Sequence, residues 1–120
     1  MSGLHIVSDL FECKNQALLR DKKLIEKTLV ETVKNIRLTV IGTCTSVYTH
    51  NSTQDHISCI VVLAESHVAA HVYKNKKYVN LDVFVCNVLN DNTEKARVID
   101  RHLKELFMPN RIRTQEIVRS

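Results

Sequence analysis

One run of residues organises this chain: Ile57-Ser58-Cys59-Ile60-Val61-Val62-Leu63-Ala64-Glu65-Ser66-His67-Val68-Ala69-Ala70-His71. It begins as a nearly unbroken apolar segment, breaks at Glu65-Ser66-His67, and returns to apolar residues that end at His71. A buried polar group without a partner costs roughly 1–3 kcal/mol, so a buried strand normally avoids these side chains. The simpler interpretation is a polar turn between two hairpin strands, with hydrogen-bonded histidines beside it. The other is a catalytic site, because a nucleophile, an acid and a base stand together at the end of a strand.

The composition is that of one globular domain spanning residues 1–120. Hydrophobic residues make up 44% of the chain and charged residues 25%, which is ordinary for a protein with a single core. Only two glycines are present, and this excludes a glycine-rich phosphate-binding loop. The formal net charge of +4 is dispersed, and the basic cluster Lys74-Asn75-Lys76-Lys77 is interpreted as a solvated hairpin turn. We therefore expect no nucleic-acid partner.

The sequence contains no recognisable targeting segment. Its start, Met1-Ser2-Gly3-Leu4-His5, lacks a basic region followed by an apolar one. No apolar run reaches the roughly 18 residues that a membrane span needs. We therefore expect a cytoplasmic protein with no membrane partner, whose four cysteines are reduced. None of these cysteines forms a Cys-x-x-Cys pair or stands at zinc-ligand spacing from a histidine, so no metal site is predicted.

Strand and helix signals alternate along the chain. Apolar residues at steps of about four, such as Ile25, Leu29 and Val33, predict an amphipathic helix over 15–35. A similar pattern predicts a helix over 91–107, with Thr93 as a candidate N-cap and Pro109 just after the helix end. Segments rich in Val, Ile and Thr, or apolar at every second position, predict strands. These strands are expected over 5–12, 37–48, 57–63, 67–73, 79–85 and 111–118, with a polar loop over 49–55.

The resulting order, β-α-β-β-β-β-α-β, indicates an α+β fold: a two-layer sandwich of an antiparallel sheet with two helices on one face. Alternate strand residues face opposite ways, so we expect the apolar residues of the central strands to exceed what one face can bury. The surplus predicts that the second face is covered by another copy of the chain, in a homodimer that pairs sheet to sheet. The residues in this argument are Val61, Leu63, Val68, Ala70, Val83 and Val85.

Several short motifs follow one another at fixed spacing. Glu65-Ser66-His67 is followed by His71 and then by Asp82-x-Phe84-x-Cys86, and the chain opens with Gly3-x-His5 and Phe11-Glu12-Cys13. Together they resemble the short, prokaryotic-type S-adenosylmethionine decarboxylase proenzymes, with order and spacing kept from about residue 3 to residue 107. Glu-Ser-His alone is common by chance, whereas the combination is specific and favours the catalytic interpretation.

The resemblance implies a pyruvoyl-dependent enzyme that cuts its own chain. In such a proenzyme Ser66 attacks the carbonyl of Glu65, and the peptide bond becomes an ester. Elimination then separates residues 1–65 from residues 66–120. Loss of ammonia leaves a pyruvoyl group at position 66, which is the cofactor of this class.

Two further residues match the family's processing machinery. His71 matches the proton acceptor, and Ser58 matches the second processing residue, on the preceding strand and within reach across the hairpin. Simple strand alternation places Ser66 and His71 on opposite faces of a strand. They share a face only if the backbone turns sharply near His67.

The decarboxylation chemistry is implied by the same resemblance. The pyruvoyl carbonyl forms a Schiff base with the α-amine of a small-molecule substrate and takes up the electrons released with carbon dioxide. Cys86 matches the family's proton donor, a role that suits a thiol. Glu65, His67 and Tyr73 are candidate substrate contacts. The product would be an aminopropyl donor for polyamine (spermidine) biosynthesis.

The substrate-binding motifs depart from the family pattern. The family usually has Thr-Trp-Pro-Glu after the second histidine, and this chain has Val72-Tyr73-Lys74-Asn75. Asn75 thus replaces the glutamate that is expected to hold the ribose hydroxyls. The loop over 49–55 has no phenylalanine to stack on adenine, and Tyr48 or His50 are the candidates to replace it.

These departures leave two alternatives open. The same chemistry could act on L-arginine or L-ornithine, which need no nucleoside grip. The chain could also be an uncleaved, non-catalytic relative or a regulatory partner of another decarboxylase. A non-catalytic relative would be expected to lack at least one active-site residue. This chain has all five: Ser58, Glu65, Ser66, His71 and Cys86.

Overall fold

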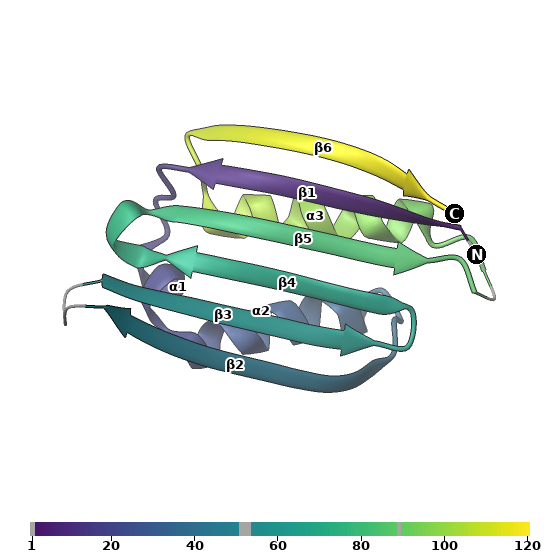
Figure 1. Ribbon diagram of the computed structural model, residues 1–120, viewed down its shortest axis with the longest axis horizontal. Helices are drawn as coiled ribbons and strands as arrows, with labels where there is room; N and C mark the ends of the chain where they lie inside the picture. The colour runs from purple at the N-terminus through teal and green to yellow at the C-terminus, as the bar shows by residue number, and fades with distance from the viewer. Residues whose placement is uncertain (1, 51–53, 89) are drawn as a thin grey trace.

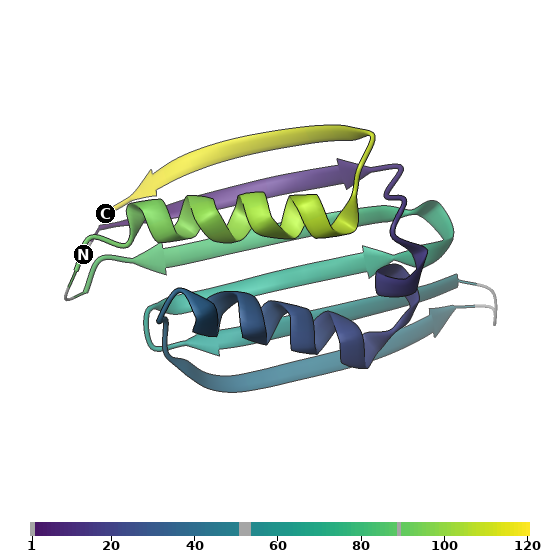
Figure 2. The same ribbon diagram turned by 180° about the vertical axis from the view of Figure 1, so that it is seen from behind.

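The computed structural model describes residues 2–50, 54–88 and 90–120, which form one antiparallel sheet with helices on one side (Figures 1 and 2). The sheet order is β2-β3-β4-β5-β1-β6. The predicted two-layer α+β sandwich is thereby confirmed. In chain order the elements are β1 (Gly3–Phe11), α1 (Gln16–Arg20), α2 (Lys22–Asn35), β2 (Val40–His50), β3 (Gln54–Leu63), β4 (Ser66–Tyr73), the 3-10 turn η1 (Lys74–Lys76), β5 (Tyr78–Cys86), α3 (Thr93–Phe107) and β6 (Arg111–Arg119).

The hydrophobic core lies between the sheet and the helices. Figure 2 shows α3 across β1 and β5, and α2 across β2 and β3. The expected surplus of apolar strand residues was wrong, because all six residues of that argument are buried in this one core. The reason is the register: Val61 pairs with Val68, and Val68 pairs with Val83. Directly opposed residues of antiparallel strands share a face, so the alternation of the three strands is in phase.

The first helical region is two helices rather than the single helix predicted over 15–35. Asp21 leaves the helical conformation, with φ −112° and ψ 102°. Its carboxylate accepts the N–H groups of Lys23 and Leu24 at 3.0 and 3.1 Å and so caps α2. Aspartate competes with the helix for backbone donors in this way, and the competition ends α1 at Arg20.

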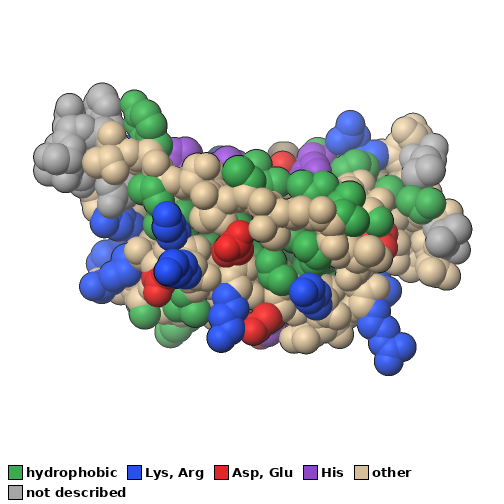
Figure 3. Space-filling view, turned by 90° about the horizontal axis from the view of Figure 1, so that it is seen from below, with side chains coloured by type: hydrophobic (Ala, Val, Ile, Leu, Met, Phe, Trp, Pro, Cys, Tyr) green, Lys and Arg blue, Asp and Glu red, His purple; other side chains and the backbone are tan. Residues whose placement is uncertain are grey.

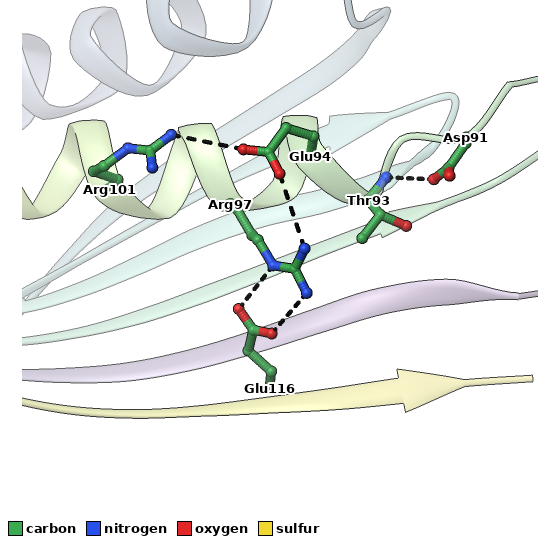
Figure 4. Close-up of polar contacts among 6 residues, drawn as sticks. All are labelled: Asp91, Thr93, Glu94, Arg97, Arg101 and Glu116. Carbon is green, nitrogen blue, oxygen red and sulfur yellow. Dashed lines mark hydrogen bonds and ion pairs between the residues drawn. The ribbon is translucent and has the colours of Figure 1, made fainter.

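The second predicted helix is present, with a different N-terminus. Asn92 occupies the N-cap position, and Thr93 is the first helical residue rather than the cap. The N–H of Thr93 donates to the Asp91 carboxylate at 3.0 Å (Figure 4). At the other end Met108 adopts a left-handed conformation with φ 56°, and Pro109 follows it as predicted.

An ion-pair network ties the edge strand β6 to α3. The guanidinium of Arg97 donates two hydrogen bonds of 3.1 Å to the Glu116 carboxylate (Figure 4). Glu94 lies 3.8 Å from both Arg97 and Arg101. These contacts hold the pKa of Glu116 below its ordinary value and raise that of Arg97. The network fixes the position of β6, which pairs with β1 along its whole length.

The hairpin of β2 and β3 is longer than predicted. The polar loop expected over 49–55 is largely strand, since Thr49 pairs with Asp55 and His50 with Gln54. The hairpin lies at the sheet edge, where polar residues can belong to a strand without being buried. Residues 51–53 of the expected loop lie outside the described residues.

Across the described part of the chain, no helix combines the length and the apolar composition needed to cross a membrane.

Candidate active site

The face of the sheet that points away from the helices, here called the open face, carries most of the motif residues. Figure 1 looks onto this face. Figure 3 looks at the molecule from the β2 edge and shows histidine side chains along the border that belongs to the open face. Pairing across the central strands places these side chains on the open face: His5, His56, Ser58, Ile60, Val62, His67, Ala69, His71, Tyr73, Asn80, Asp82 and Phe84.

The turn between β3 and β4 holds Glu65 and Ser66 in an unusual geometry. Ser66 has φ 137°, a backbone conformation that residues with a side chain rarely adopt. The carbonyl oxygen of Glu65 accepts a 2.8 Å hydrogen bond from the N–H of Cys86. The Glu65 carboxylate accepts the N–H and the hydroxyl of Thr39 at 3.0 and 3.1 Å. The Glu65–Ser66 peptide bond is therefore held from both sides in a strained conformation.

Cys86 ends β5 directly beside this turn. Besides its N–H bond to Glu65, its carbonyl accepts the side-chain amide of Asn92 at 2.9 Å. Its neighbour on β1 is Gly3, where an added Cβ would lie 2.8 Å from the Cys86 Cα. Only glycine fits there, which explains the first residue of the Gly3-x-His5 motif. Cys86 is half-buried beside Ser66, so the structure brings these two predicted site residues together.

A second cluster lies farther along the open face, where Ser58 and His71 face each other across β3 and β4. The Ser58 hydroxyl is 2.9 Å from Nδ1 of His71 and 3.3 Å from Nε2 of His56. Tyr73 stacks on His56 with the ring centroids 4.3 Å apart. Burial lowers the pKa of His71, the nearby His56 lowers it further, and Asp82 opposes the shift. His71 is thus kept neutral at physiological pH and can accept a proton.

The two clusters do not meet within one chain. β4 runs as a continuous strand from Ser66 to Tyr73, with no turn at His67. His71 lies five positions after Ser66, which is roughly 16 Å along a strand. Ser58 reaches across the hairpin, but to His71 and not to Ser66. A single chain therefore carries the components of the predicted site in two separate places.

A chain of polar contacts lies on the open face near Ser66. Arg119 donates from Nη1 to Nδ1 of His5 at 3.1 Å. His5 Nε2 bonds to the Asp82 carboxylate, and His67 Nε2 lies 3.8 Å from the same oxygen. The atoms of His5, His67 and Asp82 that could bind a metal ion lie within 4.8 Å of one another. Arg119 can only donate, so the proton of neutral His5 is on Nε2, which is then not free to bind a metal. The contacts form a hydrogen-bonded chain rather than a set of metal ligands.

The predicted substrate contacts are already engaged with neighbours. Glu65 binds Thr39, Tyr73 stacks on His56, and His67 lies beside Asp82. Tyr48 is exposed on the β2 side of the open face, and the side chain of His50 lies outside the described residues. Beyond the end of β4, a cavity of about 310 Å³ is lined by Gln16, Leu19, Arg20, Lys74, Asn75 and Lys77.

Sequence reasoning missed two contributors to this face. His56 stands two residues before Ser58, and the alternation of the strand could have placed both side chains on one face. Thr39, which holds the Glu65 side chain, comes from a distant segment. No local sequence pattern indicates that contact.

The turn thus places a serine directly after a hydrogen-bonded carbonyl, in a strained backbone conformation. The family model described as S-adenosylmethionine decarboxylase matches residues 4–120. The chain belongs to the S-adenosylmethionine decarboxylase family.

Similar proteins carry the proenzyme form of this name. The S-adenosylmethionine decarboxylase proenzyme of Methanococcus maripaludis (strain C5) is 39% identical over 84 residues, which cover 70% of this chain and 65% of that protein. The proenzyme of Pseudomonas aeruginosa (strain LESB58) is 34% identical over 101 residues, which cover 84% of this chain and 60% of that protein. The aligned part of the chain thus spans less than two thirds of either relative. The proenzyme of Methanococcus vannielii is 34% identical over 110 residues, which cover 82% of this chain and 86% of that protein.

A solved structure agrees with the fold. The crystal structure of the adenosylmethionine decarboxylase from Aquifex aeolicus VF5 superimposes with a TM-score of 0.78 at 25% sequence identity. The match covers 96% of this chain and 88% of that one.

Proposed function

We propose that this chain is a pyruvoyl-dependent decarboxylase of S-adenosylmethionine that matures by cutting itself between Glu65 and Ser66. The observation that carries the proposal is the turn itself. The scissile carbonyl of Glu65 is held by the Cys86 N–H at 2.8 Å, and the attacking residue follows at φ 137°. A backbone donor at this distance is what an oxyanion needs.

The processing reaction follows from these groups. Ser66 Oγ attacks the carbonyl carbon of Glu65 and gives its proton to a base, and negative charge develops on the oxygen that faces Cys86. The C–N bond then breaks, the nitrogen takes up a proton, and an ester links Glu65 to Ser66. Removal of the Ser66 α-proton expels the Glu65 carboxylate. This leaves a dehydroalanine at position 66, and hydrolysis of its imine form releases ammonia and leaves the pyruvoyl group.

The residues around position 66 fit this group. The pyruvoyl carbonyl, once formed, supplies an electron sink for loss of carbon dioxide from an amino acid. Cys86 lies beside the site and offers a thiol that can give a proton to the substrate carbon. Its N–H serves processing and its side chain serves decarboxylation, so the two roles can be separated by mutation.

We further propose that the working enzyme is a homodimer paired through the open face. The proton acceptor His71 and its partner Ser58 are too far from Ser66 in their own chain. A two-fold axis lying across the strands between two such faces would bring His71 of one chain to Ser66 of the other. Ile60 and Val62 lie between the two clusters on β3 and are 38% and 40% exposed. Burial of these side chains would favour such a pairing.

The substrate assignment is supported by the family and weakened by Asn75. This residue lines the cavity beyond β4 together with Arg20, Lys74 and Lys77, and no carboxylate is among the described residues that line it. L-arginine and L-ornithine are the alternative substrates, and this cationic surround does not decide between them and S-adenosylmethionine, whose sulfonium is also positively charged. Polyamine (spermidine) synthesis is the use of the product that the S-adenosylmethionine assignment implies.

Intact-mass spectrometry of purified protein tests the proposal. We expect two fragments, residues 1–65 and a second chain of residues 66–120 without a normal amino terminus. Ser66→Ala should stay whole. Cys86→Ala keeps the backbone N–H, so it should cut itself but decarboxylate at least about a hundredfold more slowly. A wild-type chain that stays whole would support a non-catalytic relative and overturn the proposal.

Release of labelled carbon dioxide from S-adenosylmethionine, L-arginine and L-ornithine tests the substrate. We expect turnover of S-adenosylmethionine. Turnover of one of the other two, without the first, would keep the chemistry and change the substrate.

A further inference from the structure

We propose that His56 is a positioning residue that holds His71 in the tautomer that can accept a proton. The inference rests on the proposed self-processing and adds a residue to it. His56 belongs to neither the Glu65-Ser66-His67 motif nor the Asp82-x-Phe84-x-Cys86 motif, but its side chain contacts Ser58.

Counting protons decides the arrangement of the three side chains. Ser58 Oγ contacts Nδ1 of His71 at 2.9 Å and Nε2 of His56 at 3.3 Å, and it has one proton to donate. If Ser58 donates to His71, the remaining proton of neutral His71 is on Nε2, and His71 has no free acceptor. If Ser58 donates to His56, Nδ1–H of His71 donates to Ser58 and Nε2 of His71 keeps its lone pair. Of these two arrangements, only the second leaves Nε2 of His71 free to take up a proton.

His56 is what makes the second arrangement available. Its Nε2 gives the Ser58 hydroxyl an acceptor other than His71. The direction of the chain is then His71 Nδ1–H to Ser58 Oγ, and Ser58 Oγ–H to His56 Nε2. The tautomer of a histidine base is set in the same way by the partner of its second nitrogen in other hydrolytic sites.

The surroundings keep His56 in place and leave His71 neutral. Tyr73 stacks on the His56 ring with an interplanar angle of 21°. Next to His71 on β5 is Asn80, whose amide donates to Asp9 on β1 and to Tyr78. The ionisable groups that act on His71 are His56 on β3 and Asp82 on β5, whereas Asp9 and Tyr78 contact Asn80.

Two substitutions separate the role of His56 as hydrogen-bond acceptor for Ser58 from its packing against Tyr73. His56→Phe keeps an aromatic ring for the stack with Tyr73 and removes the acceptor. His56→Gln places an amide oxygen near the position of Nε2 and so restores an acceptor. His56→Phe keeps the stack without the acceptor, and His56→Gln keeps an acceptor without the stack. Slow cleavage in the first variant and near-normal cleavage in the second would therefore assign the effect to the hydrogen bond rather than to packing.

Self-cleavage is followed by gel after cell-free synthesis, with rates measured at several pH values. We expect His56→Phe to cut at least about tenfold more slowly than wild type on the pH-independent plateau, and His56→Gln to stay within about threefold. A His56→Phe rate within about threefold of wild type would overturn the inference while leaving the proposed function intact. A wild-type chain that never cuts would instead overturn the proposed function.

Nitrogen NMR of the imidazoles gives a readout that does not depend on cleavage. In the uncut Ser66→Ala chain, we expect His71 to carry its proton on Nδ1. Adding His56→Phe should shift the population toward the Nε2–H form. An unchanged His71 tautomer in the double variant, or an Nε2–H form when His56 is intact, contradicts the inference even if His56→Phe impairs folding of the processed enzyme.

Discussion

Ser66 is proposed both as the nucleophile of self-cleavage and as the source of the pyruvoyl group, and the sequence could suggest these roles only in part. Its place after Glu65 and before His67 predicts that it is a nucleophile, and the family resemblance makes that prediction specific. Its φ of 137° and the Cys86 N–H that holds the preceding carbonyl are products of the fold. Both depend on the pairing of β4 with β5, which no short motif encodes.

The state of His71 is likewise set by its neighbours. Burial and the nearby His56 lower its pKa from the ordinary value of 6.5. A protonated His71 cannot act as a base, so the rate of self-cleavage should fall as the pH drops through the pKa of the folded protein. Because that pKa is lowered, we expect the midpoint of the fall below pH 6.5. Cleavage rates measured from pH 5 to pH 8 check this, and a midpoint above the ordinary histidine value would contradict it.

At the scale of elements, hydrophobic periodicity predicted the two helical regions and the central strands, because these elements bury one face against a common core. The edge strand β6 is exposed along its whole length. The break at Asp21 was not predicted, because Ile25, Leu29 and Val33 continue the apolar stripe and say nothing about the turn before them. The extended β2–β3 hairpin was missed for a related reason. Edge strands need no apolar face, so their polar residues resemble a loop.

The cap at Asp21 gives a test of the helix break. Asp21→Ala removes the acceptor for the N–H groups of Lys23 and Leu24. We expect a loss of about 1 kcal/mol in the free energy of unfolding, measured by urea titration of the Ser66→Ala chain. Asp21→Asn keeps a capping oxygen and is the matched control. Equal losses in both variants would mean that the hydrogen bonds to the capping oxygen are not the cause of the loss.

For the whole molecule, the homodimer prediction now has a different basis. The apolar residues first held to be in surplus are all buried under the helices. What remains is the distance between Ser66 and the Ser58–His71 pair, together with the exposed Ile60 and Val62 on the face between them. Periodicity alone could not reveal this separation, since it depends on the register of β3, β4 and β5.

Assembly through the open face can be tested by placing a charge on it. Ile60→Lys should give a folded monomer that does not cut itself, because a lysine buried between the two paired faces loses its hydration. Leu24→Lys is the matched control, since Leu24 is 37% exposed on α2, close to the 38% of Ile60. Analytical ultracentrifugation and gel analysis should show a cut dimer for the control. A cut dimer of Ile60→Lys would place the interface elsewhere.

The most direct test of the shared site mixes two inactive chains. Ser66→Ala has no nucleophile and His71→Ala has no proton acceptor, so each should remain whole when produced alone. In a mixed dimer, Ser66 of the His71→Ala chain would meet His71 of the Ser66→Ala chain and complete one site. Co-expression with distinguishable tags, followed by intact-mass spectrometry, should therefore reveal cleavage of the His71→Ala chain only. If both chains stay whole in a verified mixed dimer, Ser66 and His71 do not act across the interface.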